Sequence, residues 1–231
     1  MNLFSIKLIA VVAMAIDHLG IFVFNDNFYF RLIGRLAFPL FAWAIANGGV
    51  YTKNIYKYLL RIFILAIISQ VPYQLLFSYY GVDNPGLNIL FTFSLALVGL
   101  IVFKKSRNIV LRICSATALS LVALVINADY GPFGVLAVFV FYLFFDSKVK
   151  QILVYLLLVF AFFVTPIFVN KLASNFFEVN YLNFMEILSV ISLLFIASYN
   201  NQIGYKMKYV LYIFYPLHLA LLYVIKVLLV S

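Results

Sequence analysis

Long apolar stretches alternate with short polar segments along the whole chain. Most stretches have about the 20 apolar residues that a helix needs to cross a bilayer. The pattern predicts about nine membrane-spanning helices, near residues 3–24, 31–50, 57–78, 88–103, 109–127, 131–146, 150–168, 181–199 and 209–229. The third and sixth are open to a different count, because short apolar segments also tilt, kink or re-enter the membrane. We expect an all-α fold, a polytopic transmembrane helix bundle that forms a single domain over residues 1–231.

The composition agrees with a membrane setting. The 231 residues are 67% hydrophobic and 10% charged, which leaves too little polar surface to coat a soluble globule. We therefore expect a multi-pass protein of the cell membrane with lipids as partners. A net charge of +9 would suit nucleic acid, but the basic residues form short clusters between apolar runs, so we expect no nucleic acid partner. Two histidines and one cysteine argue against a metal site.

The basic residues gather in alternate connections between the predicted spans. They are Lys53, Lys57 and Arg61; Lys104, Lys105, Arg107 and Arg112; Lys148 and Lys150; and Lys206 and Lys208. The other connections hold only Arg31 and Arg35, and Lys171 opposite Glu178. By the positive-inside rule the first set is cytoplasmic, which places the N-terminus inside and the C-terminal end of the last span outside.

Polar residues within and beside the spans are concentrated on the predicted outer side. They are Asp17, His18, Arg31, Arg35, Gln70, Asn88, Asp129 and Glu186, with His218 near mid-depth. Because an ionisable side chain in hydrocarbon is costly, such residues favour function and an outward-opening cavity. Arg31 and Arg35 share a helix face and suit an anion or a carboxylate such as Asp17, although Arg31 is equally suited to interfacial anchoring. His218 also fits a Pro-distorted stretch whose ring bonds backbone carbonyls.

The spacing of Lys7 and His18 favours a particular chemistry. Eleven steps along a helix return to the same face and rise by about 16 Å. A cation at the inner surface and an imidazole deep in the membrane suit an acyl-coenzyme A, with a phosphate-rich head and a long arm. Histidine can take a proton from an acceptor or hold the acyl group itself. The alternative for His18 is a polar residue satisfied by a neighbouring helix, which is the commoner fate of a lone buried histidine. Asp17 either sets the histidine tautomer or bonds Arg31, Arg35 or another helix.

Several blocks in order along the chain resemble the TraX family. They are Ile16-Asp17-His18-Leu19-Gly20, Arg31 to Pro39, Ile68 to Pro72, Leu87 to Thr92, Ala128 to Gly131 and Phe214 to Leu219. The resemblance implies a membrane enzyme like the one that acetylates the N-terminus of conjugative pilin. It also points to acyltransferase-3 proteins, in which a basic residue and a catalytic histidine are separated by ten positions. Lys7 and His18 match that pattern, with Lys in place of the more usual Arg.

These observations lead to one main hypothesis and two rivals. The hypothesis is an acetyltransferase that moves acetyl from cytoplasmic acetyl-CoA to an extracytoplasmic acceptor, a peptide amine or a glycan hydroxyl, without a metal. His18 and Asp17 would be catalytic and Lys7 would face the coenzyme. The residues expected to bind substrate are Arg31, Arg35, Asn88, Asp129 and His218. The main rival is a transporter or flippase, although the chain lacks the repeated halves typical of that class. The other is a membrane scaffold.

Overall fold

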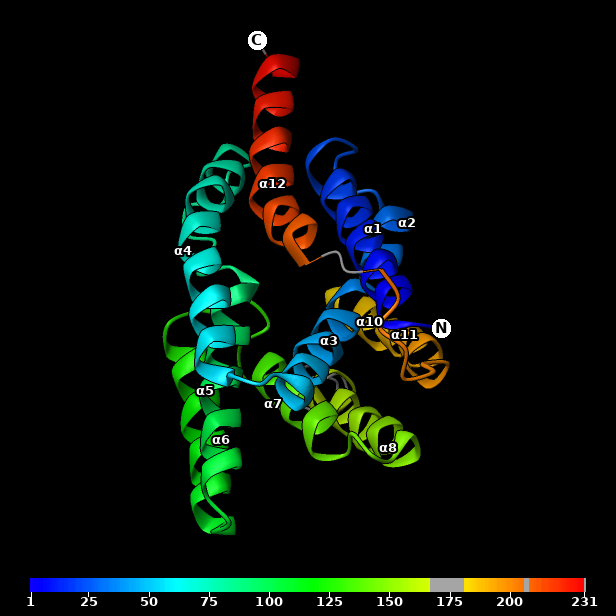
Figure 1. The fold of residues 1–231 in the computed structure, drawn as a ribbon. Coiled ribbons are helices and arrows are strands. Elements are labelled where there is room, and N and C mark those ends of the chain that lie inside the picture. The colour runs from blue at the N-terminus through cyan, green and yellow to red at the C-terminus, as the bar shows by residue number, and fades with distance from the viewer. Residues whose placement is uncertain (167–180, 206–207, 231) are drawn as a thin grey trace. The chain divides into compact units, whose positions relative to one another are not determined.

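The computed structural model describes residues 1–166, 181–205 and 208–230, and these residues are predominantly helical (Figure 1). The elements are α1 (Leu3–Phe22), α2 (Phe28–Gly34), α3 (Ala37–Tyr51), α4 (Ile55–Tyr79), α5 (Ile89–Lys105), α6 (Ile109–Val125), α7 (Gly131–Leu143), α8 (Lys148–Val159), the π-helix η1 (Phe160–Val164), α10 (Tyr181–Leu188), the 3₁₀ turn η2 (Ser189–Ile191), α11 (Ser192–Ala197) and α12 (Lys208–Val230). Each predicted apolar stretch contains one or more of these helices, which confirms the all-helical fold class. Lys171, Glu178 and Lys206 lie outside the described residues.

Three helical segments of the described chain are long and apolar enough to cross a membrane. They are Leu3–Phe22, Phe28–Tyr51 and Ile55–Tyr79, with lengths of 20, 24 and 25 residues. At 1.5 Å per residue each is as long as the roughly 30 Å hydrocarbon core of a bilayer. Other apolar helices, such as α6 and α7, are shorter. Among the described residues, length and composition thus support spanning for the first three predicted spans, and the count of nine stays a prediction.

The second predicted span is broken between α2 and α3. Pro39 explains the break, because it has no N–H to donate to the carbonyl of Arg35 and its ring clashes with that carbonyl. The chain turns at Arg35 and Leu36, and α3 begins at Ala37 with the proline in its first turn, where proline is tolerated. Arg35 is therefore the C-terminal cap of a short helix and not a residue inside a long one.

The chain separates into two compact units, and the prediction of one domain stays a prediction. Unit 1 comprises Met1–Ala44 and Leu143–Lys206, and unit 2 comprises Ile45–Tyr142 and Met207–Ser231. In unit 1, α1 packs closely on α2, because a Cβ at Gly20 would lie 2.5 Å from the Cβ of Phe30.

One end of unit 1 is tied together by hydrogen bonds to backbone carbonyls. The N–H of Leu3 donates to the carbonyl of Gln202 at 2.8 Å. The Lys148 ammonium donates to the carbonyls of Ala197 and Tyr199, at 2.7 Å each. The starts of α1 and α8 and the end of α11 therefore meet at one end of unit 1, which we call the Lys148 end.

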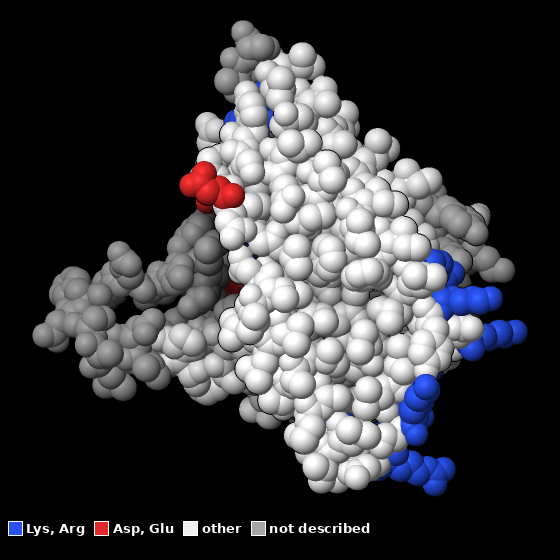
Figure 2. Space-filling view, turned by 90° about the vertical axis from the view of Figure 1, so that its left-hand side faces the viewer, with Lys and Arg blue, Asp and Glu red and all other residues white. Residues whose placement is uncertain are grey.

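In unit 2, α4, α5 and α6 pack in sequence and α12 lies beside α4 (Figure 1). The Lys105 ammonium lies 5.2 Å from the ring centre of Tyr56, which places the end of α5 beside the start of α4. At the other end, Leu87 pairs with the loop before α7, donating to the carbonyl of Asn127 at 2.9 Å. The exposed basic residues at the first end are Lys53, Lys57, Lys104, Lys105 and Arg107. Figure 2 shows Lys and Arg gathered along one edge of the face in view.

Candidate functional site

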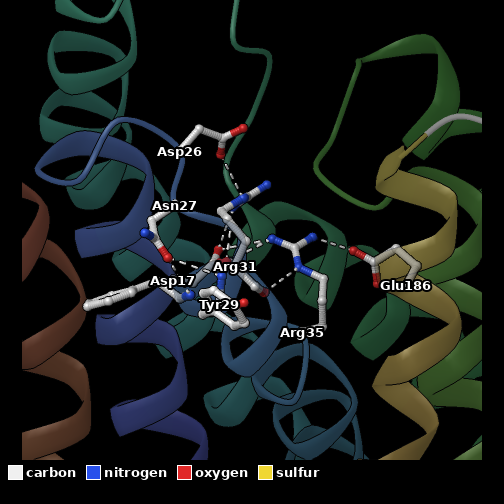
Figure 3. Close-up of polar contacts among 8 residues, drawn as sticks. Asp17, Asp26, Asn27, Tyr29, Arg31, Arg35 and Glu186 are labelled. Carbon is white, nitrogen blue, oxygen red and sulfur yellow. Dashed lines mark hydrogen bonds and ion pairs between the residues drawn. The ribbon is translucent and has the colours of Figure 1, made fainter.

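Four charged side chains of unit 1 form a continuous network, shown in Figure 3, which we call the ion-pair cluster. Arg31 Nη1 lies 2.9 Å from Asp17 Oδ2, and Arg35 Nη2 lies 3.0 Å from Asp17 Oδ1. The other terminal nitrogen of Arg35 pairs with Glu186 of α10. The cluster therefore joins α1, α2 and α10 through the carboxylate of Asp17 and the guanidinium of Arg35.

The ion-pair cluster is largely removed from solvent. Arg35 is 8% exposed and Glu186 6% exposed. Two cations face two carboxylates, which is the pairing that makes buried charge tolerable. Asp26, whose side chain is 48% exposed, adds a third carboxylate 3.1 Å from Arg31 Nε. With Asp26 included, the group has one more negative than positive charge.

The local sequence explains how α1 and α2 approach closely enough for these contacts. A Cβ at Gly34 would lie only 2.1 Å from Asp17 Oδ1, so a glycine is needed where the carboxylate passes α2. Asn25 and Asp26 have positive φ angles of 50° and 58° in the tight turn between the helices. Asn27 then caps α2, because its side chain accepts hydrogen bonds from backbone N–H groups of the first turn.

His18 follows Asp17 on α1 and is half-buried. Its ring centre lies 6.1 Å from that of Phe22. Lys7 belongs to the same unbroken helix, so the two residues share a face and stand about 16 Å apart along the axis. Lys7 is also close to the Lys148 end of unit 1, because α1 begins there. The helix therefore has the geometry that the sequence spacing predicted, and the catalytic role of His18 stays a prediction.

Asn88 of unit 2 is bonded within the protein. Its Nδ2 donates to the carbonyl of Ala66 at 2.9 Å and to Gln70 Oε1 at 2.7 Å. Its Oδ1 accepts from the N–H of Leu90 at 3.1 Å and caps α5. These contacts tie α4 to the start of α5. The structure thus gives Asn88 a structural task, and its predicted part in substrate binding stays a prediction.

Asp129 and His218 belong to a second polar group in unit 2. The Thr92 hydroxyl donates to the backbone carbonyl of Asp129. The charge of the Asp129 side-chain carboxylate acts on Tyr73 and Tyr215. His218 is 7% exposed, and its ring lies 5.5 Å from that of Tyr215.

His218 Nδ1 lies 2.9 Å from the carbonyl oxygen of Phe214. In the neutral ring this contact makes Nδ1 the donor and leaves the basic lone pair on Nε2. This is the contact with a backbone carbonyl that the sequence offered as an alternative for His218.

The structure adds residues that sequence reasoning did not assign to the site. Glu186 is separated from Arg35 by 151 positions, and only folding shows that they pair. The available signal was an acidic residue within an apolar stretch. Arg31 and Arg35 lie together with Asp17, which is the pairing that their spacing allowed. Gly34, Tyr73 and Tyr215 gave no comparable signal, because each residue type is common in membrane helices.

Comparison with known proteins now adds a relationship over nearly the full chain. The family described as TraX protein matches residues 3–226. The chain is 28% identical over 232 residues to the probable fimbrial assembly protein FimC, serogroup H1, of Dichelobacter nodosus, covering 95% of this chain and 93% of the relative. It is also 34% identical over 79 residues to the uncharacterized protein RP591 of Rickettsia prowazekii (strain Madrid E), covering 34% of this chain and 30% of the relative. No solved structure matches. The chain belongs to the TraX protein family.

Proposed function

We propose that this protein is a membrane acetyltransferase that moves acetyl groups from cytoplasmic acetyl-CoA to an extracytoplasmic acceptor. The observation that best supports the proposal is the buried ion-pair cluster one residue from His18, on a helix that also presents Lys7 on the His18 face. Buried charges within apolar helices are costly and mark functional sites in membrane proteins. The TraX relationship agrees with a membrane role.

The proposed reaction balances with the residues at hand. The acceptor nitrogen or oxygen attacks the thioester carbonyl, and an imidazole nitrogen of His18 takes the acceptor's proton. The bond from carbonyl carbon to sulfur breaks, and the proton passes to the leaving thiolate to give free coenzyme A. Alternatively His18 takes the acetyl group first and passes it to the acceptor in a second step. Lys7 would face the phosphate groups of the coenzyme at the inner surface.

The contacts of Asp17 refine its role in this proposal. Its two oxygens accept from Arg31 and Arg35, so it is best placed to hold α1 against α2 and thereby position the neighbouring His18. Because both guanidinium groups are engaged by carboxylates, the cluster is poorly suited to capture an anionic acceptor. The extra negative charge of Asp26 favours a cationic one, which supports an amine over an acidic glycan.

The proposed orientation in the membrane is based on the distribution of basic residues, and the proposed acceptor is based on the name of a relative. We propose nine spans with the N-terminus inside, so that the basic end of unit 2 faces the cytoplasm. If this end is cytoplasmic, the start of α4 and the end of α5 must lie on the same side of the membrane. The contact between Lys105 and Tyr56 agrees with that arrangement. The D. nodosus relative is named as a fimbrial assembly protein. A subunit of a surface fibre is therefore the acceptor that we propose to examine first.

The test is a transfer assay with purified protein in lipid vesicles and acetyl-CoA labelled in the acetyl group. We expect coenzyme A release that is lost in His18→Ala and kept in Thr117→Ala, an exposed control on α6. Lys7→Gln should raise KM for acetyl-CoA by about tenfold, because one charge contact with a phosphate is worth about 1–3 kcal/mol, while kcat stays within a few-fold. Full activity of folded His18→Ala would overturn the assignment. Proton-coupled solute flux without acetyl transfer would favour the transporter class.

A further inference from the structure

Buried polar side chains form a line through unit 1 between α8 and the helical run from α10 to α11. They are Gln151 (2% exposed), Tyr155 (0%), Glu186 (6%), Ser189 (0%) and Ser192 (0%). We call these five residues the polar file. Polar groups at such depth in an apolar helical protein require partners, and where protein groups do not supply them, ordered water does.

The contacts of the polar file begin at the ion-pair cluster. Glu186 pairs with Arg35. Gln151 and Tyr155 are four residues apart and share one face of α8, and Ser189 lies one turn after Glu186 on the facing helical run. One turn further along, the Ser192 hydroxyl has no hydrogen-bond partner among the residues that the structure describes. An unpartnered buried hydroxyl is destabilising, and a bound water would remove that cost.

Both facing helices depart from regular α geometry beside the polar file. The π-helix η1 follows α8 directly and begins five residues after Tyr155. The 3₁₀ turn η2 begins at Ser189 itself. Changes of helix type alter which backbone carbonyls are bonded, and such segments occur often at functional sites. One irregular segment therefore lies within the polar file and the other lies just beyond Tyr155.

The polar file reaches from the ion-pair cluster to the surface at the Lys148 end. Ala197 is eleven positions after Glu186, a rise of about 16 Å, or roughly half of the hydrocarbon core. Ala197 accepts a hydrogen bond from Lys148, which is exposed. Gln151 lies one turn into α8 from this lysine. The line of polar groups thus runs from Arg35 and Glu186 at one end to Gln151, one turn from the exposed Lys148, at the other.

We propose that the polar file holds water and conducts protons between the Lys148 end of unit 1 and Glu186. Each hydroxyl or water accepts one proton and donates another, so the chain is unchanged after a proton passes. The carboxylate of Glu186 takes up and releases that proton. The charged and titratable groups that face it in the described residues are Arg35 and Tyr155, with Asp17 acting through Arg35.

In the acetyltransferase a protonated amine acceptor releases one more proton than coenzyme A takes up, and this path would carry that proton away, a use that rests on the proposed function. The water content of the file does not depend on that function. The two claims therefore need separate measurements, one of access and one of turnover.

The access measurement compares two buried positions at the same depth, Ser192→Cys and Leu193→Cys, each with Cys114→Ser. Leu193 is 5% exposed and neighbours Ser192, but it is not part of the polar file. Vesicle-reconstituted protein is exposed to Ag⁺, a probe small enough for a narrow aqueous path. We expect Ser192→Cys to react at least about tenfold faster, because a thiol needs water to ionise. Equal rates, or no reaction of either thiol, would overturn the proposal.

The turnover measurement uses Tyr155→Phe, which removes one hydroxyl and keeps the ring. We expect kcat for acetyl transfer to fall by about tenfold or more with KM for acetyl-CoA unchanged, and the slowing in D₂O to increase. An unchanged kcat and an unchanged D₂O effect would overturn proton conduction. If the parent transfers no acetyl but Ser192→Cys still reacts with Ag⁺, the proposed function fails and the hydrated file stands.

Discussion

Replacing Arg35 tests how far the ion-pair cluster stabilises unit 1. Arg35 is 8% exposed and bonds Asp17 at 3.0 Å as well as Glu186. In Arg35→Met, Asp17 keeps its contact with Arg31, but Glu186 loses its ion-pair partner in a buried setting. Removing one member of a buried pair costs about 3–5 kcal/mol, chiefly because the other charge is left uncompensated. We expect the free energy of unfolding to fall by that amount.

The size of the Arg35–Glu186 interaction follows from a double-mutant cycle. Glu186→Gln alone should cost less, about 1–3 kcal/mol, because Arg35 still bonds Asp17. In the double variant neither an orphaned carboxylate nor an unshared guanidinium is present. Its loss should therefore be smaller than the sum of the two single losses by about 2 kcal/mol, within the range for residues in contact.

The assay is reversible unfolding of the purified protein in mixed micelles with a denaturing detergent. The matched control pair is Glu186→Gln with Arg107→Met, an exposed arginine of unit 2. Its effects should add within about 0.5 kcal/mol. If Arg35→Met and Glu186→Gln are also additive within that limit, the two side chains do not interact as we describe.

The remaining predictions concern packing, capping and orientation. Gly34→Ala should lower the unfolding free energy by about 1–3 kcal/mol, because its Cβ would lie 2.1 Å from Asp17 Oδ1; unchanged stability in the same detergent assay would show that α1 and α2 are further apart. Asn88→Ala should cost about 2 kcal/mol from a lost cap and two lost interhelical bonds, whereas Asn88→Ser should restore the cap alone; equal losses for the two variants would argue against a capping role. In cells, Lys105→Cys should be shielded from an impermeant thiol reagent and Asp129→Cys should react; the opposite result would invert the orientation.

Much of the helical content could be predicted from the sequence because apolar length and charge clusters report directly on membrane helices. The break at Arg35 was missed, although Pro39 provided the signal four residues later. The second apolar stretch was long enough for one span, so a single helix was predicted from its length and the helix-breaking effect of Pro39 was not taken into account. An apolar stretch also does not show whether its helix crosses the whole membrane, because the shorter helices are apolar as well.

The candidate site was predictable where partners are close in sequence. The i to i+4 spacing of Arg31 and Arg35 and the position of Asp17 one helix earlier allowed the pairing that the structure shows. Glu186 was not assigned because nothing local relates residue 186 to residue 35. Asn88 shows the reverse problem, because a capping asparagine and a binding asparagine look alike until their bonding partners are known.

The central claim is that acetyl groups pass from the inner to the outer side through His18. The most direct measurement seals labelled acetyl-CoA inside vesicles and supplies a peptide with a free N-terminal amine outside. We predict labelled peptide in the outer solution with the parent protein, and none with a His18→Ala variant that inserts and folds normally. Labelled peptide at the parent rate with His18→Ala, or none with either protein while acetyl-CoA stays intact, would contradict the account.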